Sequence, residues 1–222
     1  AGDMYRLLGK NADKLQALGA RLKKGVLPAP DNKQAIAFKA LSEKSFNAEI
    51  LQKLTDGGSK GFSTFMTYYL LDAISACGGA DKAVAIAKEY YGAMLDKGAT
   101  TFWEDFNIDW VKGTGRIDEF PKKGEEDIHG DRGDFCYKGF RHSLCHGWSS
   151  GVVGFVTKYL LGVTVLSAGC KKIRISPVLP DGINEVKGAY PTPFGVISIE
   201  HKRFGGKIVS KINAPDEVEI LK

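Results

Sequence analysis

The densest group of polar and aromatic side chains lies at residues 100–110, Thr-Thr-Phe-Trp-Glu-Asp-Phe-Asn-Ile-Asp-Trp. It places Glu104 and Asp105 beside Trp103, with Trp110 close behind. This combination suits sugar chemistry, because an aromatic face packs against a pyranose ring while a carboxylate binds hydroxyls or activates water. The other interpretation is an aromatic anchor at a helix end with solvated acids beside it. Composition by itself favours that second interpretation, because surface carboxylates are common.

A second cluster occupies residues 141–151, Arg-His-Ser-Leu-Cys-His-Gly-Trp-Ser-Ser-Gly. We expect a helix from about His146 to Leu161, capped by Ser143 or a neighbour. His146 and Trp148 would then face the same open end of the helical layer as the first cluster, which we call the mouth. His146 is either a hydrogen-bond donor to a substrate hydroxyl or a satisfied structural residue, and the residues alone favour neither.

Two other chemistries are weaker interpretations of these clusters. A serine hydrolase is disfavoured because we predict no nucleophile elbow. His129, His142 and His146, with the surrounding acids, lack the His-Glu-x-x-His spacing of a metal site. We therefore predict no metal and no cofactor.

Composition excludes further classes of function. The net charge is +5, and lysines and arginines are mixed with acids along the chain, so we predict no nucleic-acid partner. The sequence has no run of about 18 apolar residues, so we predict no membrane span. The four cysteines show no Cys-x-x-Cys spacing and are interpreted as buried free thiols: Cys77, Cys136, Cys145 and Cys170.

Helical periodicity and glycine stops organise the first two-thirds of the chain. A first helix is predicted from four leucines at helical spacing, ending at Gly25: Leu8, Leu15, Leu18 and Leu22. Further helices are predicted to end at Gly57, Gly78 and Gly98. The helix over residues 65–77 is apolar on most sides and should be buried. Short loops between successive helices predict helical hairpins.

After Gly162 the period changes from helical to alternating, which predicts strands at 172–175, 196–200, 207–212 and 217–220. The fold class is therefore mainly α followed by all-β. We predict one domain at 1–165 and a small antiparallel β domain at 166–222. The long Gly-rich stretch between residues 100 and 143 carries several aromatics, which is typical of a functional loop.

Four stretches, in this order, resemble the α-L-rhamnosidase family of glycoside hydrolases (family 78, the six-hairpin glycosidases). They are Gly-Gly-Ser-Lys-Gly-Phe at 57–62, Gly-Ala-Thr-Thr-Phe-Trp-Glu at 98–104, Ser-Leu-Cys-His-Gly-Trp-Ser-Ser-Gly at 143–151 and Gly-Ala-Tyr-Pro-Thr-Pro-Phe-Gly at 188–195. The resemblance runs from about residue 33 to the end. The second and third stretches are fairly specific as a pair.

The resemblance implies helical hairpins forming part of an (α/α)6 barrel, followed by a small antiparallel β-sandwich domain. It implies cleavage of terminal α-L-rhamnosyl residues with inversion by two carboxyl groups. The family's catalytic base maps onto Glu104. Residues that line the sugar site map onto Trp103 and His146, with Trp148, Asp105 and Trp110 as neighbours.

The chain departs from the family pattern in two respects. No counterpart of the family's general acid is evident, and about half of the barrel helices have none either. We therefore expect a fragment without activity unless the N-terminal half of the same protein is supplied. That half would also carry any export signal, and a periplasmic or extracellular location is favoured if the protein degrades polysaccharide. The second departure is the loop from Glu104 to Ser143. Because such a loop can reshape substrate specificity, the sequence supports glycoside hydrolysis more strongly than it supports rhamnose as the substrate.

Two alternatives remain open. One is another (α/α)6 enzyme, such as a uronyl hydrolase or a polysaccharide lyase, for which Tyr137 and Arg141 are present without a recognisable spacing. A lyase would leave an unsaturated, ultraviolet-absorbing product. The other is a non-catalytic carbohydrate-binding module.

Overall fold

The computed structural model describes residues 2–23, 31–132 and 142–221, in two compact units, Ala1–Asp31 and Asn32–Lys222. Each unit is described by itself. No helix in these three ranges is long and apolar enough to cross a bilayer.

The first unit contains two short helices, α1 (Gly2–Leu7) and α2 (Asp13–Lys23). Leu8 lies outside both, and Gly9 adopts a left-handed φ of +66° that ends the first helix. The prediction of one continuous helix through Leu8 is therefore wrong. The predicted stop at Gly25 lies outside the described residues.

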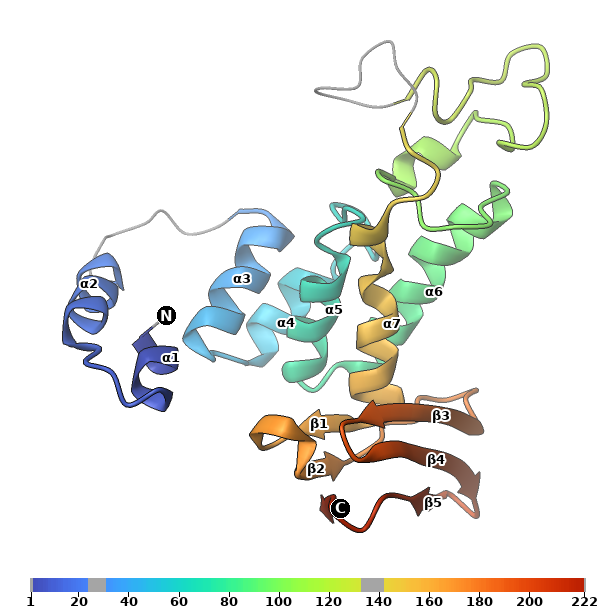
Figure 1. Ribbon diagram of the computed structural model, residues 1–222. Coiled ribbons are helices and arrows are strands. Elements are labelled where there is room, and N and C mark those ends of the chain that lie inside the picture. The colour runs from blue at the N-terminus through green and yellow to red at the C-terminus, as the bar shows by residue number, and fades with distance from the viewer. Residues whose placement is uncertain (1, 24–30, 133–141, 222) are drawn as a thin grey trace. The chain divides into compact units, whose positions relative to one another are not determined.

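The second unit begins with four helices, of which the last three end beside the glycine stops predicted from the sequence. They are α3 (Lys33–Glu43), α4 (Ala48–Thr55), α5 (Thr67–Ala76) and α6 (Ala80–Asp96), and Figure 1 shows them side by side. Asn32 and Asn47 cap α3 and α4, because their side-chain oxygens accept hydrogen bonds from Ala35 N (2.8 Å) and Ile50 N (2.9 Å). Gly78 and Gly98 adopt positive φ after α5 and α6.

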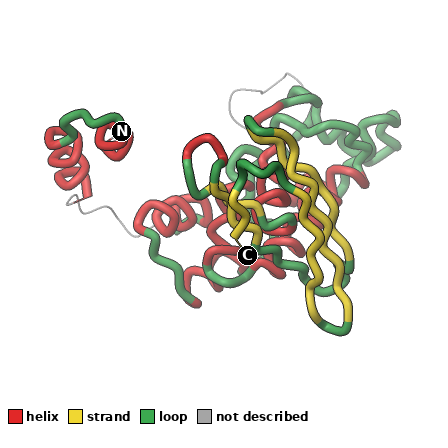
Figure 2. The backbone as a smooth tube through the Cα atoms, turned by 60° about the horizontal axis from the view of Figure 1, so that its bottom comes forward, coloured by secondary structure: helices red, strands yellow, loops and turns green. Residues whose placement is uncertain are grey.

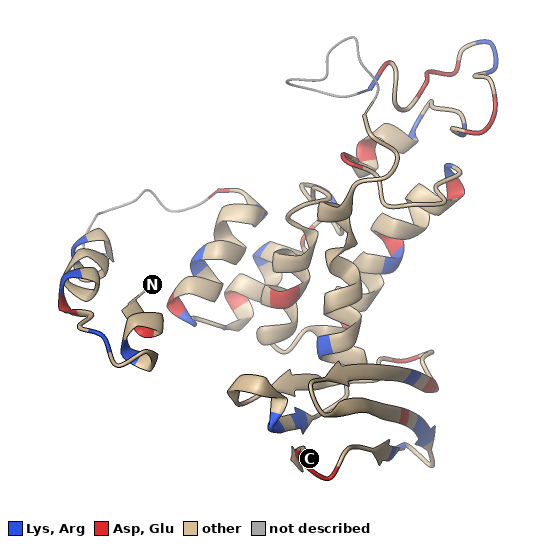
Figure 3. Ribbon diagram, in the orientation of Figure 1, with Lys and Arg blue, Asp and Glu red and all other residues tan. Residues whose placement is uncertain are grey.

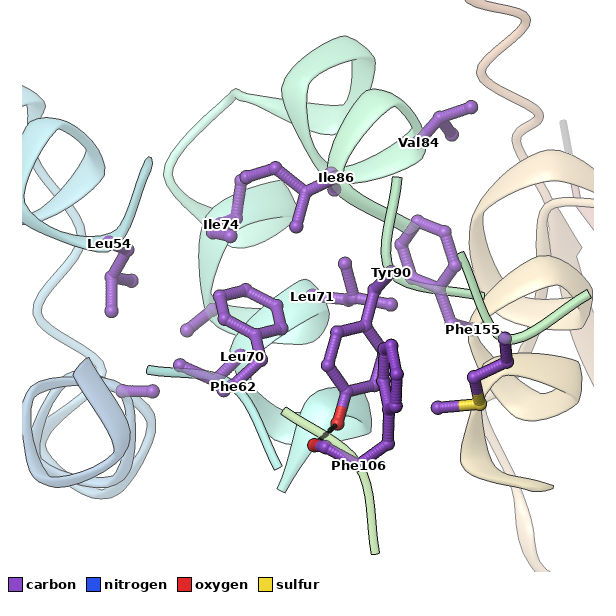
Figure 4. Close-up of a cluster of buried hydrophobic side chains, with 14 of the residues drawn as sticks. Leu54, Phe62, Leu70, Leu71, Ile74, Val84, Ile86, Tyr90, Phe106 and Phe155 are labelled. Carbon is purple, nitrogen blue, oxygen red and sulfur yellow. Dashed lines mark hydrogen bonds between the residues drawn. The ribbon is translucent and has the colours of Figure 1, made fainter. Parts of the chain in front are cut away.

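The centre of the helical layer is α5, which is buried on most sides as predicted. Leu70, Leu71 and Ile74 are fully buried, and each contributes roughly 1.5–3 kcal/mol through removal from water. Tyr90 of α6 packs beside them, and its hydroxyl donates to the main-chain oxygen of Phe106 at 2.5 Å (Figure 4). This core therefore joins α6 to the long loop that begins near residue 100.

The predicted helix from His146 to Leu161 is present in three differently wound pieces. They are the 3-10 turn η3 (Gly147–Ser150), α7 (Gly151–Phe155) and the π-helical turn η4 (Val156–Leu160). Gly151 lets this helix approach α5 closely, because a Cβ added there would lie 2.7 Å from Tyr68 Cβ. An ion pair between Lys158 Nζ and Asp72 Oδ1, at 2.5 Å, joins η4 to α5.

Two three-stranded sheets follow the helices. The first contains β1 (Val163–Val165), β2 (Lys172–Ile175) and β6 (Glu219–Leu221), in the order β1-β2-β6. The second contains β3 (Glu185–Thr192), β4 (Gly195–Phe204) and β5 (Lys207–Asn213), which Figure 2 shows as long neighbouring strands. The 3-10 turn η5 (Ala168–Cys170) separates β1 from β2.

The second sheet is antiparallel, as predicted, but the first is mixed because β2 pairs in parallel with β6. The prediction of a purely antiparallel domain is therefore wrong for the first sheet. Ile173 and Ile175 of β2 share one hydrophobic core with Ile197 and Ile199 of β4, so the inner faces of both sheets are buried together. Helices followed by two small sheets are thus shown, and the (α/α)6 barrel stays a prediction.

The buried His201 of β4 ties the second sheet to the end of the helical layer. Its Nε2 lies 3.0 Å from the Leu161 oxygen, and its Nδ1 lies 2.8 Å from Ser210 Oγ. Since a carbonyl oxygen only accepts, Nε2 carries the proton and Nδ1 accepts from the serine hydroxyl. The two contacts hold β4 and β5 against the residue that follows η4.

Candidate functional site

The structure brings the two sequence clusters side by side. The main-chain N–H of Glu104 donates to Ser143 O at 2.9 Å, and the N–H of His146 donates to Phe102 O at 2.7 Å. The hydroxyl of Thr101 also donates to the Leu144 oxygen. The segment that follows α6 therefore runs beside the segment that enters η3.

The carboxylate of Glu104 lies at the junction of these two segments. Its Oε2 accepts a hydrogen bond from the Ser143 N–H at 2.8 Å, and its Oε1 lies 4.0 Å from His146 Nδ1. The Glu104 side chain keeps 10% of its surface exposed and the His146 side chain 33%. A carboxylate fixed by a backbone N–H and still in contact with solvent can accept a proton from water.

His146 and Trp148 form the exposed rim beside this carboxylate. Their ring centroids are 4.2 Å apart, and Trp148 is 44% exposed. The indole N–H of Trp148 donates to the main-chain oxygen of Glu104 at 2.7 Å, and Phe65 meets the indole edge-on at 5.8 Å. Trp148 therefore combines an accessible aromatic face with a fixed orientation, which suits stacking on a sugar ring.

Trp103, Trp110 and Asp105 occupy less accessible positions. Trp103 is fully buried, with its ring 4.4 Å from the ring of His129, and Trp110 stacks on His142 at 5.7 Å. Asp105 is partly exposed, and its Oδ1 accepts from the N–H of the next residue at 2.8 Å. The predicted contacts of these three residues with substrate stay predictions.

Ser143 does not cap the helix that follows it, so that prediction is wrong. Its hydroxyl bonds instead to the main chain of Cys145, and His146 occupies the N-cap position without a side-chain hydrogen bond. What Ser143 supplies to the site is its N–H, which sequence reasoning did not identify because every residue except proline carries one.

Residues 147–151, Gly-Trp-Ser-Ser-Gly, have the spacing of a nucleophile elbow without its structure. A nucleophile elbow places an exposed serine between a strand and a helix. Here Ser149 is fully buried and its hydroxyl donates to Trp103 O, in a 3-10 turn that directly follows the non-strand residues 142–146. The serine is also held from the other side, because the hydroxyl of Tyr91 donates to Ser149 O at 2.9 Å. Burial raises the pKa of Tyr91, so it remains a neutral donor.

Thr64 is a site residue that the sequence analysis missed. It lies in the loop between α4 and α5, is 3% exposed, and donates its hydroxyl to Glu104 O at 2.5 Å. Its only sequence signal is its position shortly after the Gly-Gly-Ser-Lys-Gly-Phe stretch that ends at Phe62.

Other parts of the molecule supply few competing sites. The described residues contain no group of three or more histidines, cysteines or acids that could hold a metal ion. Figure 3 shows positive and negative residues interspersed along the described chain, without a basic segment. An open, mainly apolar cavity of about 560 Å³ lies between α6, α7, η4 and residues 99–102, and Glu104 does not line it.

Comparisons with known proteins agree with the fold. Residues 162–221 match the family model described as "Bacterial alpha-L-rhamnosidase C-terminal domain". Among curated proteins, no sequence relative matches. The fold is similar to three solved α-L-rhamnosidases, from Streptomyces avermitilis (complexed with L-rhamnose; 17% identity, TM-score 0.66), Aspergillus terreus (15%, 0.66) and Dictyoglumus thermophilum (19%, 0.68).

The chain spans only part of each of these structures. The matches cover 99%, 87% and 99% of this chain but 21%, 22% and 25% of the respective solved chains. The fold, with helices followed by two small sheets, is similar to that of solved glycoside hydrolases. Within that class it resembles the C-terminal part of α-L-rhamnosidases, which confirms the resemblance expected from the sequence.

Proposed function

We propose that this chain carries the catalytic base of an inverting glycoside hydrolase that releases terminal α-L-rhamnosyl residues. The observation that carries the proposal is the Glu104 carboxylate, held by the Ser143 N–H beside His146 and the exposed ring of Trp148. A second carboxyl group, the general acid, comes from an upstream half of the same protein.

The proposed reaction uses Glu104 to remove a proton from water. As the water oxygen attacks the anomeric carbon, Glu104 takes the released proton, and the glycosidic oxygen leaves with a proton from the general acid. The two carboxyl groups of an inverting enzyme stand roughly 6.5–9.5 Å apart to leave room for that water. The imidazole ring of His146 lies next to Glu104 Oε1 and is partly exposed, so it is placed to bind a sugar hydroxyl.

The sugar ring is proposed to stack on Trp148. Trp103 and Trp110 are buried and Asp105 is partly exposed, and we propose that all three belong to the substrate site, with the buried tryptophans supporting it from within the core. The aglycone side is proposed to be shaped by the loop after Trp110, whose Phe120 is 97% exposed.

We further propose that residues 1–165 form the C-terminal portion of an (α/α)6 barrel and residues 166–222 its β domain. The open apolar cavity supports an additional helical partner, since it is lined by Leu95 and Val156, which are 65% and 39% exposed. The missing half of the barrel, upstream in the same protein, is the proposed occupant, because this chain covers only 21–25% of the similar solved chains.

Association of the two halves can be tested by substitution in this cavity. Val156→Asp places a charge in the apolar wall and should abolish co-elution of the chain with its upstream half in size-exclusion chromatography. Val209→Asp is the matched control, because Val209 lies on the exposed face of β5 and is 58% exposed. Equal co-elution of the Val156→Asp variant would contradict this docking face.

The function itself is tested with an aryl α-L-rhamnoside. The 222-residue chain alone should give no turnover, and the chain with its upstream half should release the sugar. Glu104→Gln should abolish that turnover, whereas Glu43→Gln, an exposed acid on α3, should not change it. Robust turnover by the chain alone, or an unsaturated sugar product, would contradict the proposal.

A further inference from the structure

We infer that Thr64 and Trp148 are positioning residues that jointly fix the main-chain carbonyl of Glu104 and thereby aim its carboxylate. The inference rests on the proposed role of Glu104 as base. It gives Trp148 a second task beside sugar stacking, and it gives Thr64 a task where neither the sequence nor the comparisons assign one.

Each polar group of Glu104 is engaged by a neighbouring segment. Its N–H donates to Ser143 O at 2.9 Å, and its Oε2 accepts from the Ser143 N–H at 2.8 Å. Both bonds join Glu104 to Ser143, so the same peptide segment holds the carboxylate and the backbone of Glu104. The direction of the side chain therefore depends on how the Glu104 main chain is held.

The carbonyl oxygen of Glu104 is held from two other elements at once. Thr64 Oγ1 donates to it at 2.5 Å from the loop between α4 and α5, and Trp148 Nε1 donates at 2.7 Å from η3. A carbonyl oxygen has two lone pairs, so both are used. One donor would satisfy the buried oxygen, and the second also fixes the orientation of the peptide plane.

The two donors differ in how deeply they are buried and in which neighbours support them. Thr64 is 3% exposed, so bulk solvent has little access to its hydroxyl, and the Ser63 oxygen next to it already accepts from Thr67 Oγ1 at 2.6 Å. Trp148 is 44% exposed, and its ring is supported by Phe65 and His146. Thr64 is therefore the anchored donor, and Trp148 links the carbonyl to the proposed sugar-binding face.

The test uses Thr64→Val and Trp148→Phe in the chain assayed with its upstream half. Each change removes one donor: Thr64→Val keeps the side-chain volume, and Trp148→Phe keeps an aromatic ring on which the sugar can stack. Since a misplacement of about 1 Å can cost about 10²-fold in rate, we expect kcat to fall by about tenfold or more in each variant, with KM changed by less than about twofold. Thr64→Ser restores the hydroxyl and should recover kcat. Thr55→Val, which removes a hydroxyl bonded within α4, is the matched control and should leave kcat unchanged.

The outcomes separate this inference from the proposed function. If Glu104→Gln is inactive while Thr64→Val and Trp148→Phe keep wild-type kcat, the inference is overturned and the proposed function stands. If Glu104→Gln retains wild-type kcat, the proposed function is overturned together with the inference. An increase in KM alone for Trp148→Phe, with kcat unchanged, would assign Trp148 to sugar stacking only and overturn its positioning role.

A second measurement covers the case in which Thr64→Val does not fold. In the 222-residue chain, hydrogen exchange of the Ser143 amide reports directly on its bond to Glu104 Oε2. Trp148→Phe should speed that exchange by about tenfold, a change expected for local opening, while the α6 amide of Ala83 keeps its wild-type rate. Unchanged exchange at Ser143 would overturn the inference.

Discussion

Replacement of Gly151 by alanine tests the close approach of α7 to α5, on which the placement of Trp148 depends. A Cβ at Gly151 would lie 2.7 Å from Tyr68 Cβ and 3.8 Å from Tyr68 Cα. The first contact is shorter than carbon atoms tolerate, and neither atom belongs to the free end of a flexible side chain. The helix must therefore move away from α5 or α5 must give way.

The expected magnitude follows from two opposing effects. Alanine in place of glycine favours a helix by roughly 0.5–1 kcal/mol, and overpacking a filled core costs roughly 1–3 kcal/mol. We expect Gly151→Ala to lower the free energy of unfolding by about 1–2 kcal/mol. Gly92→Ala on α6 is the matched control, because an added Cβ there meets no atom within 4 Å, and it should raise stability by about 0.5–1 kcal/mol.

Urea unfolding followed by circular dichroism measures both variants against the parent chain. The reasoning predicts opposite signs for the two glycines. If Gly151→Ala is as stable as the parent, or shifts in the same direction as Gly92→Ala, the contact between α7 and Tyr68 is not as tight as the structure indicates.

Two further predictions concern buried polar groups. Burial raises the folded-state pKa of Tyr91 above its usual value near 10, so the stability that its neutral hydroxyl contributes is complete below pH 10 and is lost as pH rises further. Tyr91 alone should then lower the free energy of unfolding by about 1.4 kcal/mol per pH unit, so the fall measured in Tyr91→Phe should be less steep than in the parent by about that amount. An unchanged slope would contradict this. Asp72→Asn replaces the charged acceptor of Lys158 and Tyr159 by a neutral amide oxygen and should cost about 1–3 kcal/mol in urea unfolding, whereas Glu49→Gln breaks an exposed pair with Lys53 and should cost less than about 0.5 kcal/mol. Equal effects would contradict the partial burial of Asp72.

The helices could be predicted because local signals decide where they begin and end. Gly57, Gly78 and Gly98 adopt the positive φ that ends a helix, and the apolar run through α5 is buried on most sides as its composition implies. The prediction of the first helix was wrong because of a glycine that was not identified as a stop. Gly9 interrupts a leucine pattern that looks continuous, and periodicity alone does not show which glycine stops a helix.

Four of the strands after Gly162 could be predicted from alternation, but β1 and β3 were missed, and the pairing could not be predicted. β6 lies parallel to β2 because the chain returns across the sheet after Val218, and the register is fixed by the bond from Glu219 N to Lys171 O at 2.8 Å. Pairing of this kind depends on contacts between distant residues, which period-two patterns do not encode.

The candidate site was predictable in its residue types and not in its hydrogen bonds. The proximity of Glu104, His146 and Trp148 follows the expectation that both clusters face one mouth. The contribution of Thr64 could not be read from the sequence, because a single threonine in a loop carries no pattern. The burial of Trp103 could not be predicted either, because a tryptophan beside an acid occurs both in exposed sugar-binding positions and in the core.

The most direct test of the central claim compares Glu104→Gln with the parent in the chain assayed with its upstream half. Turnover of an aryl α-L-rhamnoside and the dissociation constant for L-rhamnose are measured on the same preparations. Loss of a general base predicts a fall in kcat of roughly 10²–10⁴-fold, with rhamnose binding changed by less than about threefold. Turnover that stays within threefold of the parent would show that Glu104 does not activate the attacking water.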